Sequence, residues 1–410
     1  MSNSSFDKEF FRGNRQKLRE LFLGTAPIVI TANGLVQKNA DETLEFAQDS
    51  NFWYLTGLNE PNLILVMDKN KEYLIVPEYS EIHDFFDGKI SYNTVKNISG
   101  IEECYPDKDG WKILNSRIKK TKHVATLAAN PKFIAAYGMY SNPARETLIN
   151  KLKEINPNIE LLDLRAHMMN LRVIKQLPEI EAIREAIGIT VNTLKPIMRQ
   201  KRLDKYGYEY EIEADITSGF RSKGAAKHAF TPIVGSGINS TIIHSTLNNS
   251  KIEANLPIVI DVGARFGNYS ADITRTIVPG KISKRVRNVY EAVLSAQNYA
   301  ITLLKPGVIL EDYEEEMEHF IGEKLRELGL IKIIDKENVR KYFPHMVSHF
   351  LGIDVHDVGD YKKPLVPNMV VTCEPGIYIP EESIGIRIED DILITDDGCE
   401  ILSSNLPREL

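Results

Sequence analysis

Five side chains that could bind metal ions lie in two stretches of this sequence, residues 261–272 and 349–389. They are four carboxylates and one imidazole: Asp261, Asp272, His349, Glu374 and Glu389. Each stands in an apolar, strand-like context. Burying an unpaired carboxylate costs several kcal/mol, so a buried cluster of four needs a cation or protons. Two divalent metal ions would neutralise the cluster, and the set therefore predicts a two-metal hydrolase.

The prediction depends on the joint occurrence of these residues, because each position alone is a weak signal. Asp261 and Asp272 are eleven residues apart, and a hairpin of two adjacent strands would bring their carboxylates together. Taken alone, two aspartates in a hairpin are more typical of turns or the surface. Three of the nine histidines, His349 among them, lie within residues 345–356. Glu389 stands among isoleucines, where an acidic side chain indicates a paired charge or a ligand.

The chemistry of the donor atoms limits the choice of metal. Four carboxylates and one imidazole favour Mn²⁺, Mg²⁺, Fe²⁺ or Co²⁺ over a thiolate-preferring site, and zinc is also compatible. Carboxylates can bridge two ions roughly 3.5–4 Å apart, and water held between such ions becomes hydroxide near neutral pH.

Composition excludes several classes of protein. The chain has 410 residues, enough for two domains, and its net charge of −7 favours neither nucleic acid nor an anionic membrane as a partner. Charged side chains throughout the first 25 residues exclude a signal peptide, and no run approaches the roughly 18–20 apolar residues of a membrane helix. Three scattered cysteines, Cys104, Cys373 and Cys399, without a CxxC pair, predict a cytoplasmic protein with reduced thiols.

The first part of the chain reads as an α/β domain, because short β-rich runs bounded by turn formers alternate with helical patterns. The expected elements are a helix over 7–23, β-rich runs over 26–31, 51–58, 62–68, 72–78 and 123–129, and a helix over 145–155. The pattern changes near residue 172, where Pro178 and Glu179 mark the start of a long helix. We therefore expect domains over residues 1–172 and 173–410.

The second domain reads as α+β. The expected helices cover 207–223, 284–304 and 311–329, and the expected strands cover 232–237, 255–267, 369–379 and 384–395. The final residues, NLPREL, read as a loose tail.

Four segments carry a resemblance to a known family: VIDVG with YSADITRT, SHFLGIDVHD, EPGIYI and IGIRIEDD. They resemble the Xaa-Pro aminopeptidase (aminopeptidase P) and prolidase family, peptidase family M24B. The front segment DSNFWYLTGLNEPNLILVM resembles its creatinase-type N-terminal domain. The resemblance covers nearly the whole chain. It implies a creatinase-like α/β domain followed by an α+β pita-bread metallopeptidase domain.

The resemblance also implies roles for individual residues. Asp261 would bind one Mn²⁺ ion, Asp272 and Glu389 would bridge two, and His349 and Glu374 would complete the second site. The further active-site residues that it implies are His244, His345, His356 and Arg387. A structural alternative for Arg387 is an ion pair with a ligand carboxylate. Asp41 matches a family acidic residue near a neighbouring subunit's site.

The implied reaction releases the N-terminal residue from a peptide whose second residue is proline. Glu374 would act as the general base. His244 or His356 would stabilise the oxyanion, and His356 or Glu374 would protonate the leaving nitrogen. The implied assembly is a homodimer or a homotetramer.

Several departures from the family pattern leave alternatives open. Met346, Phe350 and the residues around Thr246 differ from the common family residues. The short connection between Glu374 and Glu389 also occurs in prolidases, which cut Xaa-Pro dipeptides only. A second alternative is a non-catalytic or creatinase-like member of the fold, which typically lacks the ligands.

Overall fold

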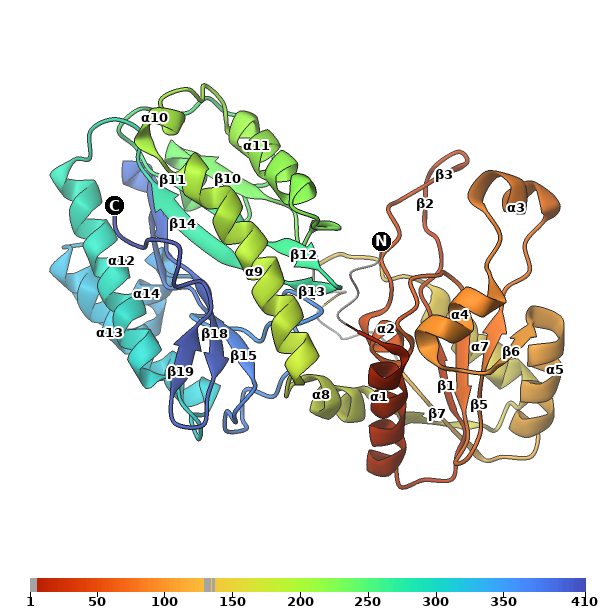
Figure 1. The fold of residues 1–410 in the computed structure, drawn as a ribbon. Coiled ribbons are helices and arrows are strands. Elements are labelled where there is room, and N and C mark those ends of the chain that lie inside the picture. The colour runs from red at the N-terminus through yellow and green to blue at the C-terminus, as the bar shows by residue number, and fades with distance from the viewer. Residues whose placement is uncertain (1–5, 129–133, 135–136) are drawn as a thin grey trace. The chain divides into compact units, whose positions relative to one another are not determined.

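The computed structural model describes residues 6–128, 134 and 137–410. The described residues form two compact units, Phe6–Leu171 and Arg172–Leu410, and each contains an apolar core (Figure 1). None of the helices in this part of the chain combines the length and apolar character that crossing a bilayer requires.

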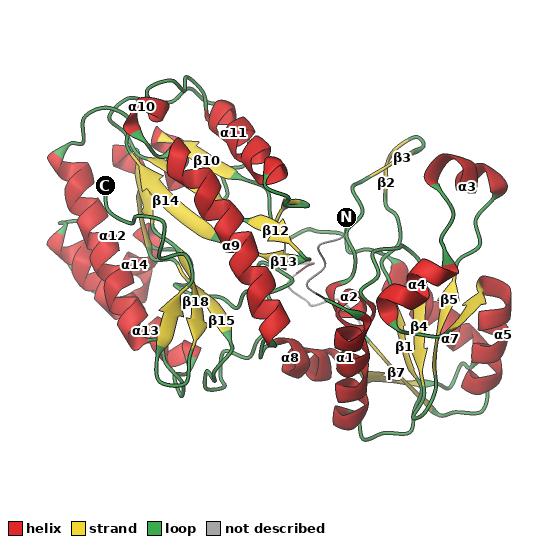
Figure 2. Cartoon of the chain, in the orientation of Figure 1, coloured by secondary structure: helices red, strands yellow, loops and turns green. Residues whose placement is uncertain are grey.

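The first unit is built on a mixed six-stranded sheet with the order β6-β5-β4-β1-β7-β8. Its strands are β1 (Ile28–Thr31), β4 (Ile64–Met67), β5 (Glu72–Val76), β6 (Glu103–Pro106), β7 (His123–Thr126) and β8 (Glu160–Asp163). The helices around it (Figure 2) are α1 (Lys8–Leu21), α2 (Ser50–Thr56), α3 (Glu81–Asp87), α4 (Tyr92–Ser99), α5 (Asp107–Ile118), α7 (Ala144–Ile155) and α8 (Arg165–Arg172), with α8 ending where the second unit begins. A small hairpin consists of β2 (Gln37–Asn39) and β3 (Glu42–Thr43). This architecture confirms an α/β N-terminal domain.

One expected strand of this unit is wrong. Residues 51–56 of the expected strand 51–58 lie in helix α2, and Gly57 and Leu58 follow the helix. Asp49 caps the helix by accepting hydrogen bonds from the backbone N–H groups of Asn51 and Phe52, and Gly57 ends it in the left-handed conformation. The aromatic run of this segment is typical of a strand, but the capping residues Asp49 and Gly57 favour a helix.

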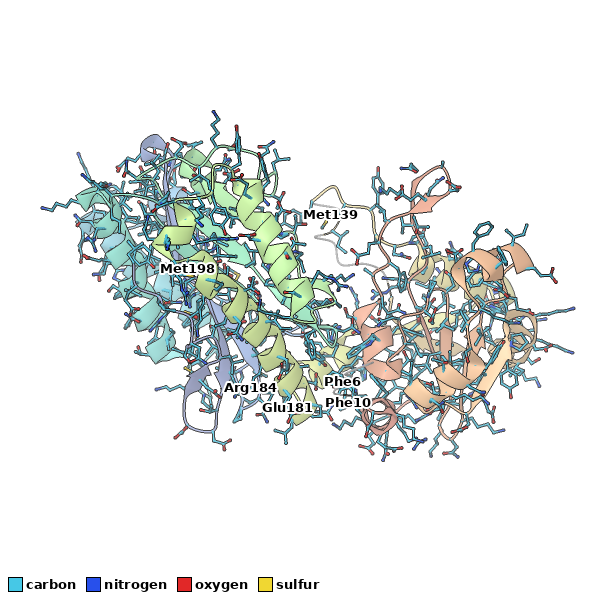
Figure 3. All side chains as sticks on the ribbon, turned by 45° about the horizontal axis from the view of Figure 1, so that its top comes forward. Phe6, Phe10, Met139, Glu181, Arg184 and Met198 are labelled. Carbon is cyan, nitrogen blue, oxygen red and sulfur yellow. The ribbon has the colours of Figure 1, made fainter. Side chains whose placement is uncertain are left out.

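The second unit begins with the long amphipathic helix α9 (Leu177–Ile197). Ile183 and Ile187 are buried, whereas Glu181 and Arg184 lie on its exposed face (Figure 3). The other helices are α10 (Gln200–Leu203), α11 (Glu209–Ser222), α12 (Lys284–Leu303), α13 (Leu310–Glu327), α14 (Lys336–Tyr342) and the short 3₁₀ turns η1 (Gly237–Thr241) and η2 (Pro380–Glu382). The three helices expected after α9 therefore exist as α11, α12 and α13.

Short antiparallel sheets form the centre of this unit. One has the order β10 (Ile233–Ser236), β11 (Ile258–Val262), β14 (Ile273–Ile277), and a second has the order β15 (Val370–Cys373), β18 (Asp390–Ile394), β19 (Cys399–Ile401). The remaining strands are β9 (Lys227–His228), β12 (Ala264–Phe266) and β13 (Tyr269–Ser270) in a third sheet, and the hairpin β16 (Gly376–Ile379) with β17 (Ile384–Arg387).

Three segments expected as single strands are broken. Residues 255–267 divide into β11 and β12 at Gly263, and the other two segments are each broken at a glutamate. Residues 369–379 divide into β15 and β16 at Glu374, and residues 384–395 divide into β17 and β18 at Glu389. The breaks let each glutamate leave the pleated ladder, while the backbone N–H of Glu389 bonds to the carbonyl of Thr274 at 3.0 Å. Both acidic residues therefore lie where strands end.

The expectation of a loose C-terminal tail is also wrong. Leu406 is buried, and the backbone carbonyls of Leu406 and Pro407 accept hydrogen bonds from the buried Arg275. Tyr290 donates a hydrogen bond to the carbonyl of Arg408. The composition of NLPREL gives no indication of these contacts, because they are made by backbone carbonyls.

Candidate metal centre

The predicted ligands converge on one cavity of about 310 Å³ in the second unit. Its charged and imidazole lining consists of Asp261, Asp272, Glu374, Glu389, His349, His244, His356 and Arg387. Phe230, Ile233, Ile243 and Val355 supply an apolar wall. A mixed lining of this kind, apolar with a few convergent polar groups, is typical of a ligand-binding site.

Adjacent antiparallel strands bring the two aspartates together. Asp261 lies in β11, and Asp272 immediately precedes β14, which pairs with β11 in a register that sets Val262 opposite Ile273. The hairpin expected from the spacing therefore exists, with the short strands β12 and β13 inserted between its arms.

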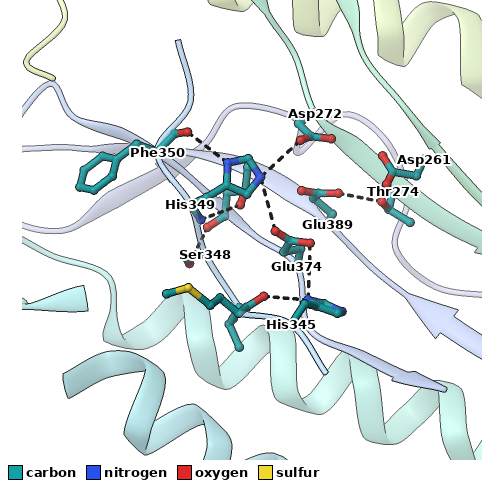
Figure 4. A network of polar contacts seen from close by, with 12 residues as sticks. Asp261, Asp272, Thr274, His345, Ser348, His349, Phe350, Glu374 and Glu389 are labelled. Atoms are coloured by element: carbon teal, nitrogen blue, oxygen red, sulfur yellow. Dashed lines mark hydrogen bonds and ion pairs between the residues drawn. The ribbon is translucent and has the colours of Figure 1, made fainter. Parts of the chain in front are cut away.

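The ring of His349 faces two of the carboxylates, those of Asp272 and Glu374 (Figure 4). Its Nε2 atom is 3.4 Å from Asp272 Oδ2 and 3.4 Å from Glu374 Oε1. Donor atoms of Asp272, His349 and Glu389 all lie within 4.8 Å of one another. His349 Nδ1 lies 3.1 Å from the carbonyl oxygen of Phe350, an arrangement that leaves Nε2, the nitrogen on the side of the carboxylates, available to a metal ion.

Two carboxylate oxygens provide a test of whether these residues fit a cation. Asp261 Oδ1 and Glu389 Oε1 are buried and have no hydrogen-bond partner among the described residues. The other oxygen of each group is bonded, Asp261 Oδ2 to Arg387 and Glu389 Oε2 to Thr274. A buried carboxylate oxygen without a partner is costly, and a metal ion would satisfy both. The residues present therefore fit a divalent metal.

The electrostatics of the cavity also favour a bound cation. Burial and the charge of Asp261 raise the pKa of Asp272 well above its usual range. Burial likewise raises the pKa of Glu374, with the charge of Glu389 contributing, and the pKa of Glu389, with the charge of Asp272 contributing. Clustered buried carboxylates repel one another and bind protons when no cation is present. A bound cation reverses this effect.

A chain of hydrogen bonds connects His345 to the aspartate of β11. His345 Nε2 is 2.8 Å from the hydroxyl of Tyr378, and Arg387 donates to the same hydroxyl at 2.8 Å and to Asp261 Oδ2 at 2.6 Å. His345 Nδ1 lies 3.7 Å from Glu374 Oε2. Arg387 therefore makes the ion pair with Asp261 that the structural alternative describes, and it also lines the cavity.

Tyr378 is a site residue that the motif analysis did not single out. Its hydroxyl fits because Gly376, two residues earlier on the same face of β16, has no side chain; a Cβ there would lie 2.6 Å from this oxygen. The glycine in EPGIYI, read with the period of two in a strand, could have indicated it.

The remaining histidine positions lie around the same cavity. The rings of His349 and His356 are 4.4 Å apart, and burial and the neighbouring His244 lower the pKa of His356. His244 and His356 are both in the cavity wall. Asp41 lies in the exposed turn of the β2–β3 hairpin in the first unit.

His345 should make the stability of the metal-free protein depend on pH. Burial, reinforced by Arg387, lowers the pKa of His345 to about 3. The unfolded chain therefore binds a proton below its pKa of about 6.5 that the native state does not bind, and native stability is lost as pH falls from about 6.5 to 3. His345→Asn removes this contribution. We expect the difference in free energy of unfolding between wild type and variant, measured in urea, to shrink as pH falls from about 6.5 to 3. Parallel plots of the two free energies against pH would contradict the assignment.

Comparison with known proteins indicates a metallopeptidase, as the side-chain cluster does. Residues 181–396 match the model of metallopeptidase family M24, and residues 11–126 match that of the aminopeptidase P N-terminal domain. The fold and the side-chain cluster define a metallopeptidase with an N-terminal aminopeptidase P-type domain and a pita-bread catalytic domain. The chain belongs to metallopeptidase family M24, and Asp272, His349 and Glu389 in its cavity are residue types that can hold a divalent metal ion.

Relatives match over nearly the full length. The chain is 32% identical to an Xaa-Pro aminopeptidase of Haemophilus influenzae, over 98% of this chain and 96% of the relative. It is 32% identical to human Xaa-Pro aminopeptidase 3, over 93% of this chain and 79% of the relative. The solved structure of Escherichia coli aminopeptidase P with the inhibitor Pro-Leu superposes with a TM-score of 0.86 at 27% identity, covering 98% of this chain and 96% of that one.

Proposed function

We propose that this protein is an Xaa-Pro aminopeptidase, a metallohydrolase that releases the N-terminal residue from peptides with proline in second position. One observation carries the proposal: four carboxylates and His349 from five separate segments meet in one cavity, and two of the carboxylate oxygens have no hydrogen-bond partner within the described part of the chain. Membership of family M24 and relatives named Xaa-Pro aminopeptidase support the substrate class.

The proposed cofactor is a pair of divalent ions, with Mn²⁺ preferred. Asp261, Asp272, His349, Glu374 and Glu389 would hold the pair, as the oxygen-rich donor set favours. When bound, such ions lower the pKa of water and polarise the substrate carbonyl. His349 suits a ligand role because burial lowers its pKa to about 3, so the imidazole is neutral at physiological pH.

The chain's own groups would move the protons. We assign Glu374 as the general base, because its carboxylate lines the cavity among the proposed ligands and can accept a proton from water. His244 and His356, in the cavity wall, would donate hydrogen bonds to the developing oxyanion. His356 or Glu374 would then protonate the leaving proline nitrogen. Arg387 would orient Asp261 through their 2.6 Å contact.

The apolar wall suits proline. A proline nitrogen within a peptide bond has no N–H, so a site that offers a flat apolar surface and no acceptor at that position favours the ring. Phe230, Ile243 and Val355 lie on that wall.

The proposal extends to location and assembly. The three cysteines, all free, support a cytoplasmic location. Ile82, Phe85 and Phe86 on α3 are exposed, and such apolar surface supports a homodimer or homotetramer, which light scattering would test.

We also propose residue 172 as the boundary between the N-terminal and catalytic domains, and a contact of Asp41 with a neighbouring subunit.

Metal removal tests the proposal directly. Protein stripped by a chelator should hydrolyse a tripeptide with central proline at least about 100-fold more slowly, because the ions contribute several kcal/mol to catalysis. Adding Mn²⁺ should restore the rate, with two ions bound per chain by elemental analysis. Equal rates in stripped and loaded protein would reject the proposal.

The same assay separates the prolidase alternative, which the short connection between Glu374 and Glu389 favours. Rates on an Xaa-Pro dipeptide, the tripeptide and longer peptides are compared on one metal-loaded sample. An aminopeptidase accepts the longer peptides. Cleavage of the dipeptide alone would establish a prolidase.

A further inference from the structure

A buried polar network lies behind the candidate metal centre, and Arg275 is at its centre. Arg275 belongs to β14, three residues after Asp272, and its side chain is fully buried. It does not line the cavity. The proposed function gives it no role.

Each N–H group of the Arg275 guanidinium has a partner. The partners are the carbonyl oxygens of Pro407 (2.8 Å), Leu406 (3.0 Å), Thr274 (2.9 Å) and Glu389 (2.5 Å) and the Oδ1 atom of Asp390 (2.7 Å). A guanidinium has five N–H donors in a fixed planar arrangement, so this set uses all of them. The side chain therefore joins three segments: β14, the start of β18 and the C-terminal residues 406–407.

Glu389 is held at three points by two consecutive residues of β14. Its backbone N–H bonds to the Thr274 carbonyl at 3.0 Å, its own carbonyl accepts from Arg275, and its Oε2 accepts from the Thr274 hydroxyl at 2.7 Å. Its Oε1 has no hydrogen-bond partner among the residues described. The backbone of Glu389 is thus fixed outside regular strand structure with one oxygen directed to the cavity.

Asp390 anchors the network from the other side. It accepts hydrogen bonds from Arg275, from Gln297 at 2.8 Å and from Ser403 at 2.5 Å. The next residue, Asp391, accepts from the backbone N–H of Asp272 at 3.1 Å. Both candidate bridging residues, Asp272 and Glu389, are therefore connected to this network through backbone groups.

We propose that Arg275 is a positioning residue of the metal centre, which fixes Glu389 for metal binding by anchoring it to the C-terminal residues Leu406 and Pro407. Glu389 lies at a strand break, where no ladder holds its carbonyl. The guanidinium replaces the missing ladder bond and connects it to a buried segment. Because supporting groups behind a ligand commonly change metal affinity by about 10–100-fold, the loss of Arg275 should weaken binding by that factor. This inference rests on the proposed metal centre.

The test measures Mn²⁺ affinity by titration calorimetry on full-length chelator-treated protein, at a temperature where circular dichroism shows every variant folded. Arg275→Gln should bind Mn²⁺ at least about tenfold more weakly than wild type. Arg275→Lys keeps the charge and up to three donors, so its affinity should lie between the two.

Two controls separate positioning from general destabilisation. Leu325→Ala removes a buried core side chain of α13 and lowers the melting temperature, but should leave Mn²⁺ affinity unchanged. Arg184→Gln removes an arginine whose partner, Glu400, is in an exposed ion pair, and should change neither property.

The possible outcomes are distinct. Equal Mn²⁺ affinity in folded wild type and Arg275→Gln would overturn the positioning role, and so would an equal loss in Leu325→Ala. If Arg275→Gln does not fold, Arg275→Lys decides by the same criterion. A wild-type protein that binds no Mn²⁺ would instead reject the proposed metal centre.

Discussion

Glu374→Gln is expected to lower kcat for a central-proline tripeptide by about 10²–10⁴-fold, the usual contribution of general acid–base catalysis. Glutamine keeps the size of the side chain but cannot accept a proton from water. The loss should lie toward the upper end of this range, because Glu374 is also a proposed ligand, with Oε1 3.4 Å from His349 Nε2. Steady-state kinetics on metal-loaded protein measure kcat and KM separately.

A matched control lies in the same unit. Glu382, in η2, forms a partly exposed ion pair with Arg285 away from the cavity lining. Glu382→Gln should retain the wild-type rate and melting temperature within error. A Glu374→Gln protein that is folded, metal-loaded and as fast as wild type would remove Glu374 from the proposed mechanism.

Asp261→Asn should remove one of the two ions. Asp261 Oδ1 is buried without a partner among the described residues, while Oδ2 is held by Arg387. Replacing the carboxylate by an amide removes the negative charge and leaves the Arg387 guanidinium facing a neutral group. We expect the metal content to fall from two ions to about one, and kcat/KM to fall by about 10³-fold, as several kcal/mol of Lewis-acid stabilisation are lost.

Elemental analysis and kinetics on the same sample check this prediction. Asp396→Asn, in the exposed turn between β18 and β19, is the matched control and should bind two ions at the wild-type rate. Circular dichroism establishes that both variants are folded. Two bound ions with normal turnover in Asp261→Asn would show that this carboxylate is no ligand.

Several elements could be predicted because their signals are local. The helices α11, α12 and α13 follow from apolar periodicity, and β11 follows from an apolar run that ends near Asp261. The eleven-residue spacing of Asp261 and Asp272 was compatible with two adjacent strands, and the pairing of β11 with β14 shows them. Residues 51–58 were misread because aromatic composition favours a strand, whereas the Asp49 cap and Gly57 terminate a buried helix.

Other features depend on partners distant in the chain. Tyr378 enters the site through a hydroxyl contact with His345 and Arg387, which no local pattern contains. The C-terminal segment is fixed by Arg275, about 130 residues earlier, through carbonyl groups that every residue has. Backbone acceptors carry no sequence signal, so their use could not be anticipated.

The donor set could be identified from residue types alone, since side-chain chemistry and charge belong to the residues wherever they lie. The sequence also indicated the alternation of helices and strands that carries them. The packed fold is needed to place Glu374 and Glu389 at strand breaks, to leave two carboxylate oxygens without a partner among the described residues, and to set the groups behind the ligands. Those properties arise from contacts between residues distant in sequence, whose distances and burial are fixed only once the chain has packed.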